Sequence, residues 1–346
     1  MQLSLIKVTP SQHKPLLFLV LFFLFLPLFP QSALALNSSF DENLKFEHIT
    51  AADGLSQSYV FDLVQDSDGY IWIATQDGLN KYDGMTFKYY RSNVLDENSV
   101  ADNYIRKLFI SSKGELWVGT ANGLSKYNKA LDNFTNYYFD KHNSNTLLDN
   151  VIWDIYEDKG ENFNKGKNKT NNLWISTEKG LHKFDAVNER FDRITFRKPT
   201  SSPELNTKEI TNIFQDSNGN YWFSSYENGF FITNKNITLN NTLKKQIQNE
   251  IGNETTLINK LIIIDNEFWL ATNNGVYVLN DNYQLKDKYP LTDFAEETVL
   301  ARNIILANDS HIWVATDQGL KSINPLEGTF KSHSFNNVVE QEYNNY

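Results

Sequence analysis

A short segment centred on tryptophan recurs six times along this chain of 346 residues. Its clearest copy reads Tyr70-Ile71-Trp72-Ile73-Ala74-Thr75, followed by a variable pair and then Gly78-Leu79. The six copies are centred on Trp72, Trp117, Trp174, Trp222, Trp269 and Trp313, so that successive tryptophans lie 44 to 57 residues apart. A repeat of about this length is typical of a β-propeller, in which each copy forms one sheet of four strands.

Each copy has the pattern of a strand buried on both faces, followed by a tight turn. Around Trp72 both alternating sets of side chains are apolar, as in a strand packed between layers. A glycine follows each tryptophan, which indicates a hairpin turn with a positive φ. These glycines are Gly78, Gly123, Gly180, Gly229, Gly275 and Gly319, and the fourth stands one residue later than the others. We therefore predict an all-β protein, a β-propeller of four-stranded antiparallel blades with six blades recognisable.

Two copies carry insertions. Residues 159–172 are rich in Gly, Asn and Lys, and we interpret them as a surface loop. Residues 236–259 contain Leu243, Ile247 and Ile251 at a spacing of four, which predicts a short helix with these three side chains on one face.

The beginning of the chain has the organisation of a secretory signal peptide. Basic side chains precede an apolar run over residues 16–29, and a small-x-small sequence ends at Ala35. The run is shorter than the roughly 20 residues that a membrane-spanning helix needs, and it contains Pro27. We therefore predict a signal peptide over residues 1–35, cleaved after Ala35. The mature chain, residues 36–346, is then a periplasmic or secreted propeller domain.

Charge and cysteine content restrict the partners of the mature chain. The sequence has 42 acidic and 32 basic side chains, a formal net charge of −10, whereas nucleic-acid phosphates require a basic surface. We therefore predict no nucleic-acid partner. There are no cysteines, so the exported domain depends on its own core and not on disulfides. No later segment is apolar enough to cross a bilayer, and no membrane segment is predicted in the mature chain.

The order of these features resembles the two-component regulator propeller repeat, a family of periplasmic sensor blades. The opening Asp53-Gly54-Leu55-Ser56, the turn Asp66-Ser67-Asp68-Gly69, the strand Ile71-Trp72-Ile73-Ala74-Thr75 and the pair Gly78-Leu79 follow the family pattern. The resemblance extends over residues 44–335. It implies the ligand-sensing part of a hybrid histidine kinase or diguanylate cyclase, in which the kinase or cyclase activity belongs to a C-terminal output domain.

Family propellers are typically seven-bladed, and this chain departs from that pattern at its end. It stops after the outer strand of the sixth copy, at residues 329–335, while residues 46–49 resemble a further outer strand of a last blade. We expect a truncated part of a longer receptor, with an incomplete seven-bladed ring; the alternative is a ring that stays open or closes irregularly. Exposed strand edges favour pairing with another chain, so a homodimer through the sensor domains is also expected.

No catalytic motif accompanies the repeats. The six histidines are scattered, and neither a cysteine nucleophile nor a phosphate-binding glycine loop occurs. Asp66-Ser67-Asp68-Gly69 begins like a calcium loop, but its recurrence as Asp216-Ser217-Asn218-Gly219 favours a hairpin turn. We predict no catalytic residue, no metal and no cofactor. Two alternative functions remain, a secreted lyase or hydrolase similar to streptogramin lyase and a free propeller that serves as a binding scaffold.

A ligand is expected at the axial mouth of the ring, where turns from successive blades converge. The pair of residues before each box glycine varies, while the flanking hydroxyl and glycine do not. Aromatic, Asn and Asp side chains suit sugars, and the family resemblance implies glycans or their breakdown products, so the expected ligand is a small molecule or an oligosaccharide. The predicted ligand-binding residues are Gln76, Asp77, Asn122, Glu178, Asn273, Asn274, Asp317 and Gln318.

Overall fold

The structure of the protein is a computed structural model that describes residues 46, 48–158, 172–196, 209–226, 229–252, 256–292, 298–307 and 310–333. The predicted signal peptide lies outside these residues, as does the predicted surface loop except for its last residue. Within the described part of the chain, no helix has the length and apolar character needed to span a membrane.

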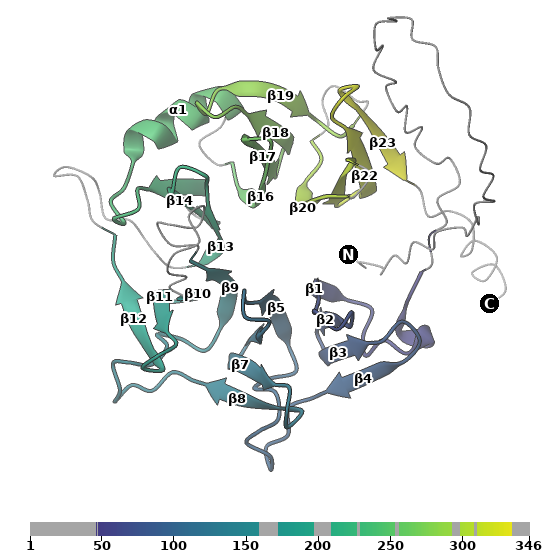
Figure 1. The fold of residues 1–346 in the computed structure, drawn as a ribbon, viewed down its shortest axis with the longest axis vertical. Helices are drawn as coiled ribbons and strands as arrows, with labels where there is room; N and C mark the ends of the chain where they lie inside the picture. The colour runs from purple at the N-terminus through teal and green to yellow at the C-terminus, as the bar shows by residue number, and fades with distance from the viewer. Residues whose placement is uncertain are drawn as a thin grey trace, which may run out of the picture.

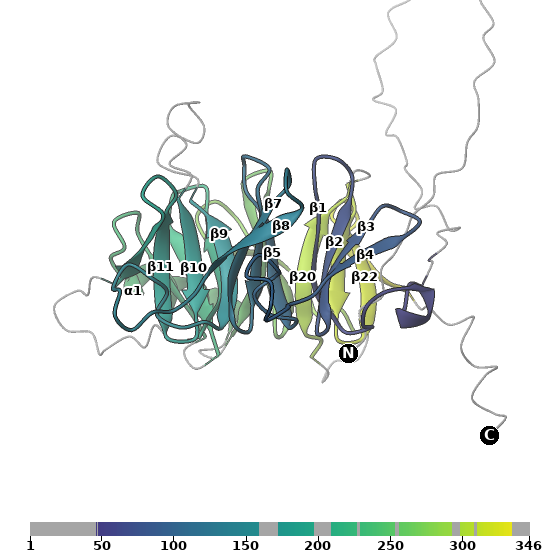
Figure 2. The same ribbon diagram turned by 90° about the horizontal axis from the view of Figure 1, so that it is seen from below.

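Six antiparallel sheets follow one another in chain order around a common centre, which confirms the predicted β-propeller (Figure 1). Seen from the side, the ring is a flat disc (Figure 2). The first blade consists of β1 (Val60–Gln65), β2 (Ile71–Thr75), β3 (Gly78–Tyr82) and β4 (Phe87–Tyr90). The second consists of β5 (Ile105–Ile110), β6 (Leu116–Thr120), β7 (Gly123–Asn128) and β8 (Asn133–Tyr137). The third consists of β9 (Ile152–Glu157), β10 (Leu173–Thr177), β11 (Gly180–Asp185) and β12 (Arg190–Ile194).

The fourth blade departs from the prediction of four strands in every blade. It has three described strands, and the helix α1 follows where the other blades have a fourth strand. The fourth blade consists of β13 (Ile210–Gln215), β14 (Tyr221–Ser225) and β15 (Gly229–Thr233), followed by α1 (Asn241–Ile251). The fifth consists of β16 (Ile258–Ile264), β17 (Glu267–Thr272), β18 (Gly275–Leu279) and β19 (Leu285–Tyr289). The sixth consists of β20 (Ala301–Leu306), β21 (Ile312–Thr316), β22 (Gly319–Asn324) and β23 (Thr329–His333).

The helix α1 confirms the prediction made from the spacing of its apolar residues. Leu243, Ile247 and Ile251 are its buried residues, and they join the core shared by the fourth and fifth blades. The Asn240 side chain caps the first turn by accepting a hydrogen bond from the Leu243 backbone, and Gly252 ends the helix in the left-handed conformation. The helix thus contributes an apolar face in place of an outer strand.

The core of the protein lies mainly between blades. The Trp72 indole of the first blade packs in one cluster with Ile105, Leu108 and Val118 of the second blade. Because both faces of an inner strand are covered by neighbouring sheets, β6, β10 and β14 are buried along their whole length. The predicted positive φ of the box glycines is confirmed in all six copies.

The sixth and first blades do not pack against each other in this way. Neighbouring inner strands contact one another from β1 through β20, but no comparable contact joins β20 to β1 within the described residues. Figure 1 shows this opening beside β1, and a cavity of about 430 Å³ lies there between the two blades. Of the predicted outer strand at residues 46–49, the described residues Phe46, His48 and Ile49 belong to no named strand. The Phe46 ring lies edge-on to Trp313, with 6.3 Å between ring centroids. We call this place the open junction, and the five contacts between successive blades the closed junctions.

Candidate ligand-binding site

The turns predicted to carry ligand-binding residues have a common frame. In the first blade the Thr75 hydroxyl donates to the Gly78 carbonyl at 2.9 Å and accepts from the Asp77 backbone at 3.1 Å. The donor bond to the glycine carbonyl recurs in four other blades, from Thr120, Thr177, Thr272 and Thr316. The hydroxyl and the glycine therefore fix the turn, and the two residues between them are free to vary.

The structure places all eight predicted ligand residues in these turns, at the same end of their blades. Five of them have side chains that bind elsewhere in the protein. Arg91 pairs with Asp77 at 2.9 Å, and Asn150 donates to Asn122 at 2.9 Å. Asn273 and Asp317 accept from backbone N–H groups, and Asn274 donates to the Tyr277 hydroxyl.

The remaining three predicted residues present open side chains. Gln76, Glu178 and Gln318 are exposed, and their side chains make no hydrogen bond within the described residues. The assignment of the eight residues to a ligand therefore stays a prediction, with these three as its most accessible members.

A row of aromatic rings, which the sequence analysis missed, lies at the same end of the blades. Tyr59 and Phe61 have ring centroids 4.8 Å apart, and Phe61 and Tyr104 are 4.9 Å apart. Arg106 continues the row, because its guanidinium carbon lies 5.3 Å from the Tyr104 centroid and 4.3 Å from the Trp153 centroid. We call the whole set the mouth row, which comprises Tyr59, Phe61, Tyr104, Arg106, Trp153 and Tyr226.

Tyr226 ends the mouth row in the fourth blade. Its ring lies 6.0 Å from that of Trp153 in an edge-on arrangement, and 62% of the residue is exposed. Tyr226 follows Ser225 directly, so it occupies the turn position that Gln76 occupies in the first blade. The late glycine of the fourth copy, Gly229, was the sequence signal that could have identified this longer turn.

Phe61, Arg106 and Trp153 share one structural origin. Each is the extra residue of a β-bulge near the start of its inner strand, where the register skips one position. A bulge re-aims a side chain and often occurs beside functional sites. The same bulge occurs in all six blades, and its residues form what we call the bulge ring: Phe61, Arg106, Trp153, Thr211, Asn259 and Arg302.

The residues that directly follow the bulges of the first three blades are charged: Asp62, Lys107 and Asp154. Lys107 Nζ lies 3.2 Å from Asp154 Oδ1 and 3.5 Å from Asp62 Oδ2, so one cation links the first three blades. Burial opposes the charge on Lys107, but the two carboxylates outweigh burial and raise its pKa. The Leu108 backbone donates to Asp62 and the Ile213 backbone to Asp154. These bonds tie neighbouring inner strands together below the mouth row.

The aspartates of the other turns have a structural role. Asp66 accepts hydrogen bonds from the Trp72 indole at 2.8 Å and from the backbones of Asp68 and Tyr70. Asp216 likewise accepts from the Trp222 indole, at 2.9 Å. N–H donors occupy the carboxylate oxygens that a calcium loop would use to bind the ion. The motif Asp66-Ser67-Asp68-Gly69 is therefore explained as a hairpin turn.

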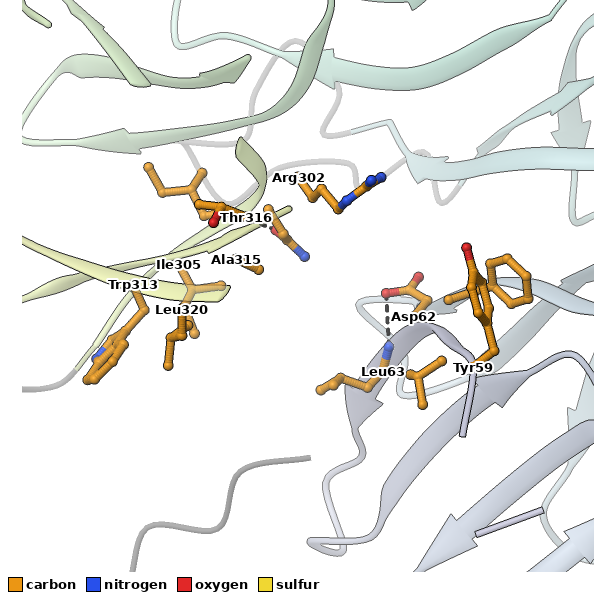
Figure 3. A pocket seen from close by; sticks show the side chains of 13 residues that line it. Tyr59, Asp62, Leu63, Arg302, Ile305, Trp313, Ala315, Thr316 and Leu320 are labelled. Atoms are coloured by element: carbon orange, nitrogen blue, oxygen red, sulfur yellow. Dashed lines mark hydrogen bonds between the residues drawn. The ribbon is translucent and has the colours of Figure 1, made fainter. Parts of the chain in front are cut away.

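The cavity at the open junction adjoins one end of the mouth row. In Figure 3, Tyr59, Asp62 and Leu63 of the first blade face Arg302 and Ile305 of the sixth blade across it. The cavity therefore has an apolar part between the sheets and a polar end at the bulge ring.

Comparison with known proteins agrees with this geometry. Residues 54–77 and 204–227 match the family described as two component regulator propeller. A stretch of 61 residues is 51% identical to "Histidine kinase P4" of Formosa agariphila. That stretch covers 18% of this chain and 4% of the kinase.

Two solved structures share the fold. One is the extracellular domain of BT3049 from B. thetaiotaomicron, described as a hybrid two component system, with a TM-score of 0.65 and 22% identity over 84% of this chain. The other is the extracellular domain of BT4673 from the same organism, described as a one component system, with a TM-score of 0.59 and 21% identity over 80% of this chain. The chain covers 37% and 36% of those domains, so it spans well under two thirds of their length.

Fold, repeat and match together define the class of this protein as a six-bladed β-propeller with a Trp-centred box in every blade. Two of its six repeats match the two-component regulator propeller family, which the chain resembles in fold.

Proposed function

We propose that this propeller is the periplasmic ligand-sensing domain of a bacterial hybrid two-component receptor. The domain follows a signal peptide cleaved after Ala35, and it binds an extracellular ligand, a glycan or a glycan fragment, at the axial mouth. Phosphorylation is the task of a separate output domain of the receptor. The likeness to extracellular domains of two-component systems and the match to a histidine kinase support this role.

The mouth row is the observation that carries the proposal. It runs over four successive blades, at the end of the ring where the variable turns lie. Aromatic faces pack against the C–H faces of sugar rings, and a row of them suits an extended ligand that crosses several blades. Gln76 and Glu178 lie in turns at the same end of the blades, with exposed polar side chains that suit hydroxyl groups.

The test is a glycan array on the purified protein, followed by titration calorimetry with each glycan that binds. We expect Tyr226→Ala to weaken binding by up to about tenfold, since an aromatic contact contributes about 0.5–1.5 kcal/mol. Met85→Ala is the matched control: Met85 is 89% exposed in the turn at the opposite end of the first blade, and the variant should bind normally. Equal binding by both variants and the unchanged protein would place the ligand elsewhere and refute the proposed site.

A further inference from the structure

Two arginines of the bulge ring differ from Arg91 and Arg190 in their ion pairs. They differ in their place at the mouth from Arg193, which is also without an ion pair in the described residues but lies on the outer strand β12. Arg91 pairs with Asp77 at 2.9 Å, and Arg190 pairs with Asp192 at 3.2 Å. In contrast, Arg106 and Arg302 form no ion pair with any described residue, although the sequence has 42 acidic side chains. Two guanidinium groups at the mouth without a carboxylate partner in the described residues are therefore available to bind an anionic ligand.

The aromatic rings around Arg106 orient its guanidinium group for binding an anion. Its guanidinium lies between the rings of Tyr104 and Trp153, which fixes its plane without using its N–H donors. Arg106 Nε and Trp153 Nε1 are both buried, and neither has a hydrogen-bond acceptor within the described part of the chain. A buried donor without an acceptor is costly, and a ligand oxygen at this position would satisfy it.

Arg302 supplies a second cation: it belongs to the sixth blade, whereas Arg106 belongs to the second, so the first blade lies between them. It lines the polar end of the cavity at the open junction, opposite Tyr59 and Asp62 (Figure 3). The cavity volume of about 430 Å³ falls within the range of small-ligand sites, about 300–1,000 Å³. Tyr59 begins the mouth row, so a ligand in the cavity that contacts Arg302 can continue along the rings toward Arg106.

Three acidic groups at this end of the inner strands already have partners. Lys107 lies within ion-pair distance of both Asp62 and Asp154, and each carboxylate also accepts a backbone hydrogen bond. Asp102, near the start of β5, accepts from the Tyr104 backbone at 2.7 Å. These bonds reduce the repulsion that an incoming anion would meet, and they leave the two guanidinium groups as the cations of the mouth.

From these contacts we infer that the mouth selects anionic saccharides, with a carboxylate or sulfate group bound by Arg106 or Arg302 and the sugar rings packed along the mouth row. This inference rests on the proposed function and specifies its ligand class. Carboxylate and sulfate share the geometry that a guanidinium recognises through two parallel N–H donors. Ring stacking alone would accept neutral sugars equally well, so the arginines provide the selection.

The experiment uses three saccharides of equal length: galactotriose, trigalacturonate and galactotriose sulfated on each residue. Titration of the purified protein should show binding of trigalacturonate or of the sulfated sugar, and that arm identifies the preferred anion. Galactotriose should bind at least tenfold more weakly. Raising the salt concentration should weaken the anionic arm more than the neutral one.

Variants then locate the selecting charge. Arg106→Gln and Arg302→Gln should each weaken anionic binding about tenfold, and the double variant should bind all three sugars alike. Arg193→Gln is the matched control, because Arg193 is exposed on the outer strand β12, away from the mouth. Thermal unfolding of every variant shows whether it is folded.

Two outcomes would overturn the inference. The first is that neither anionic sugar binds better than galactotriose, and the second is that the two arginine variants bind like the unchanged protein. Binding of a neutral glycan that Tyr226→Ala weakens would still support the proposed function, so failure of the ligand class and failure of the sensor role give different results.

Discussion

The closed junctions and the open junction place the same sequence box in different surroundings. At the closed junctions the box tryptophans are at most 3% exposed, and each is covered by the following blade. Within the described residues no blade follows Trp313, which is only half-buried, as are Ala315 and Leu320 of the same box. The comparison teaches that a blade of this protein does not bury its own core: the next sheet does so.

Backbone bonding supports three of the closed junctions. There the turn glycine donates its N–H to the loop that leads into the next blade: Gly78 to Asn103 at 2.7 Å, Gly123 to Asn150 at 2.8 Å and Gly275 to Val299 at 2.8 Å. Among the described residues, Gly319 at the open junction has no such bond, and neither have Gly180 and Gly229. On the other side of the opening, Ile49 and Leu55 cover the first blade and are buried. The open junction is thus incomplete chiefly on the side of the sixth blade.

The largest expected difference between the two kinds of junction concerns the tryptophans themselves. Trp269→Ala should lower the free energy of unfolding by about 3–5 kcal/mol, because it leaves a cavity between two packed sheets. Trp313→Ala should cost about 1–2 kcal/mol, since water already reaches the indole. Urea unfolding followed by circular dichroism measures both. Equal losses would show that the open junction is packed like the closed ones.

A buried histidine provides the second difference. His182 is fully buried at the junction of the second and third blades, and its Nε2 accepts the Leu148 N–H at 3.0 Å. Burial lowers the pKa of His182 to about 4. The unfolded chain therefore takes up the proton first as the pH falls below about 6.5, and this contribution to stability is lost between about pH 6.5 and pH 4.

The expected loss from His182 is about 2–3 kcal/mol between pH 7.5 and pH 4.5. His182→Asn is the matched variant, because Asn80 occupies the same strand position in the first blade and accepts the Ser56 N–H at 2.9 Å. Urea unfolding at the two pH values should show a smaller acid loss in the variant. Asn80 is also the equivalent residue at the open junction, and an amide does not titrate, so the effect belongs to the closed junction. The same acid loss in variant and unchanged protein would contradict the assignment.

The smallest expected difference concerns two glycines with nearly the same backbone angle. Gly275 has φ +90° and Gly319 has φ +93°, so alanine is strained by about 1 kcal/mol at either position. At Gly275 an added Cβ would lie 2.4 Å from the Tyr289 carbonyl oxygen, whereas at Gly319 the nearest atom is 3.9 Å away. Gly275→Ala should therefore cost about 1–3 kcal/mol more than Gly319→Ala in thermal unfolding. Identical costs would mean that the two turns are equally crowded.

Much of the fold could be predicted from local sequence patterns. The alternation around Trp72, the glycine of each turn and the spacing of Leu243, Ile247 and Ile251 are short-range signals, and each produced the expected element. The three-stranded fourth blade was not predicted. Phe230 and Phe231 of β15 read like any buried strand, and nothing local shows that a helix follows in place of an outer strand.

The candidate site was less accessible to sequence reasoning. The variable turns were found because their flanks repeat, but the mouth row depends on bulges, which arise from the register between two strands. Phe61, Arg106 and Trp153 share no chemistry that would mark them as equivalent. Their contacts also join different blades, and such contacts depend on how the sheets are arranged around the axis.

Hydroxyl-radical footprinting of the purified protein tests the division into closed and open junctions most directly, because mass spectrometry reports the oxidation of each tryptophan separately. We expect Trp313 to be oxidised several-fold faster than Trp72, Trp117, Trp174, Trp222 and Trp269, with the half-buried Trp153 of the mouth row as an internal reference. Protection of Trp313 equal to that of the other five box tryptophans would contradict the account.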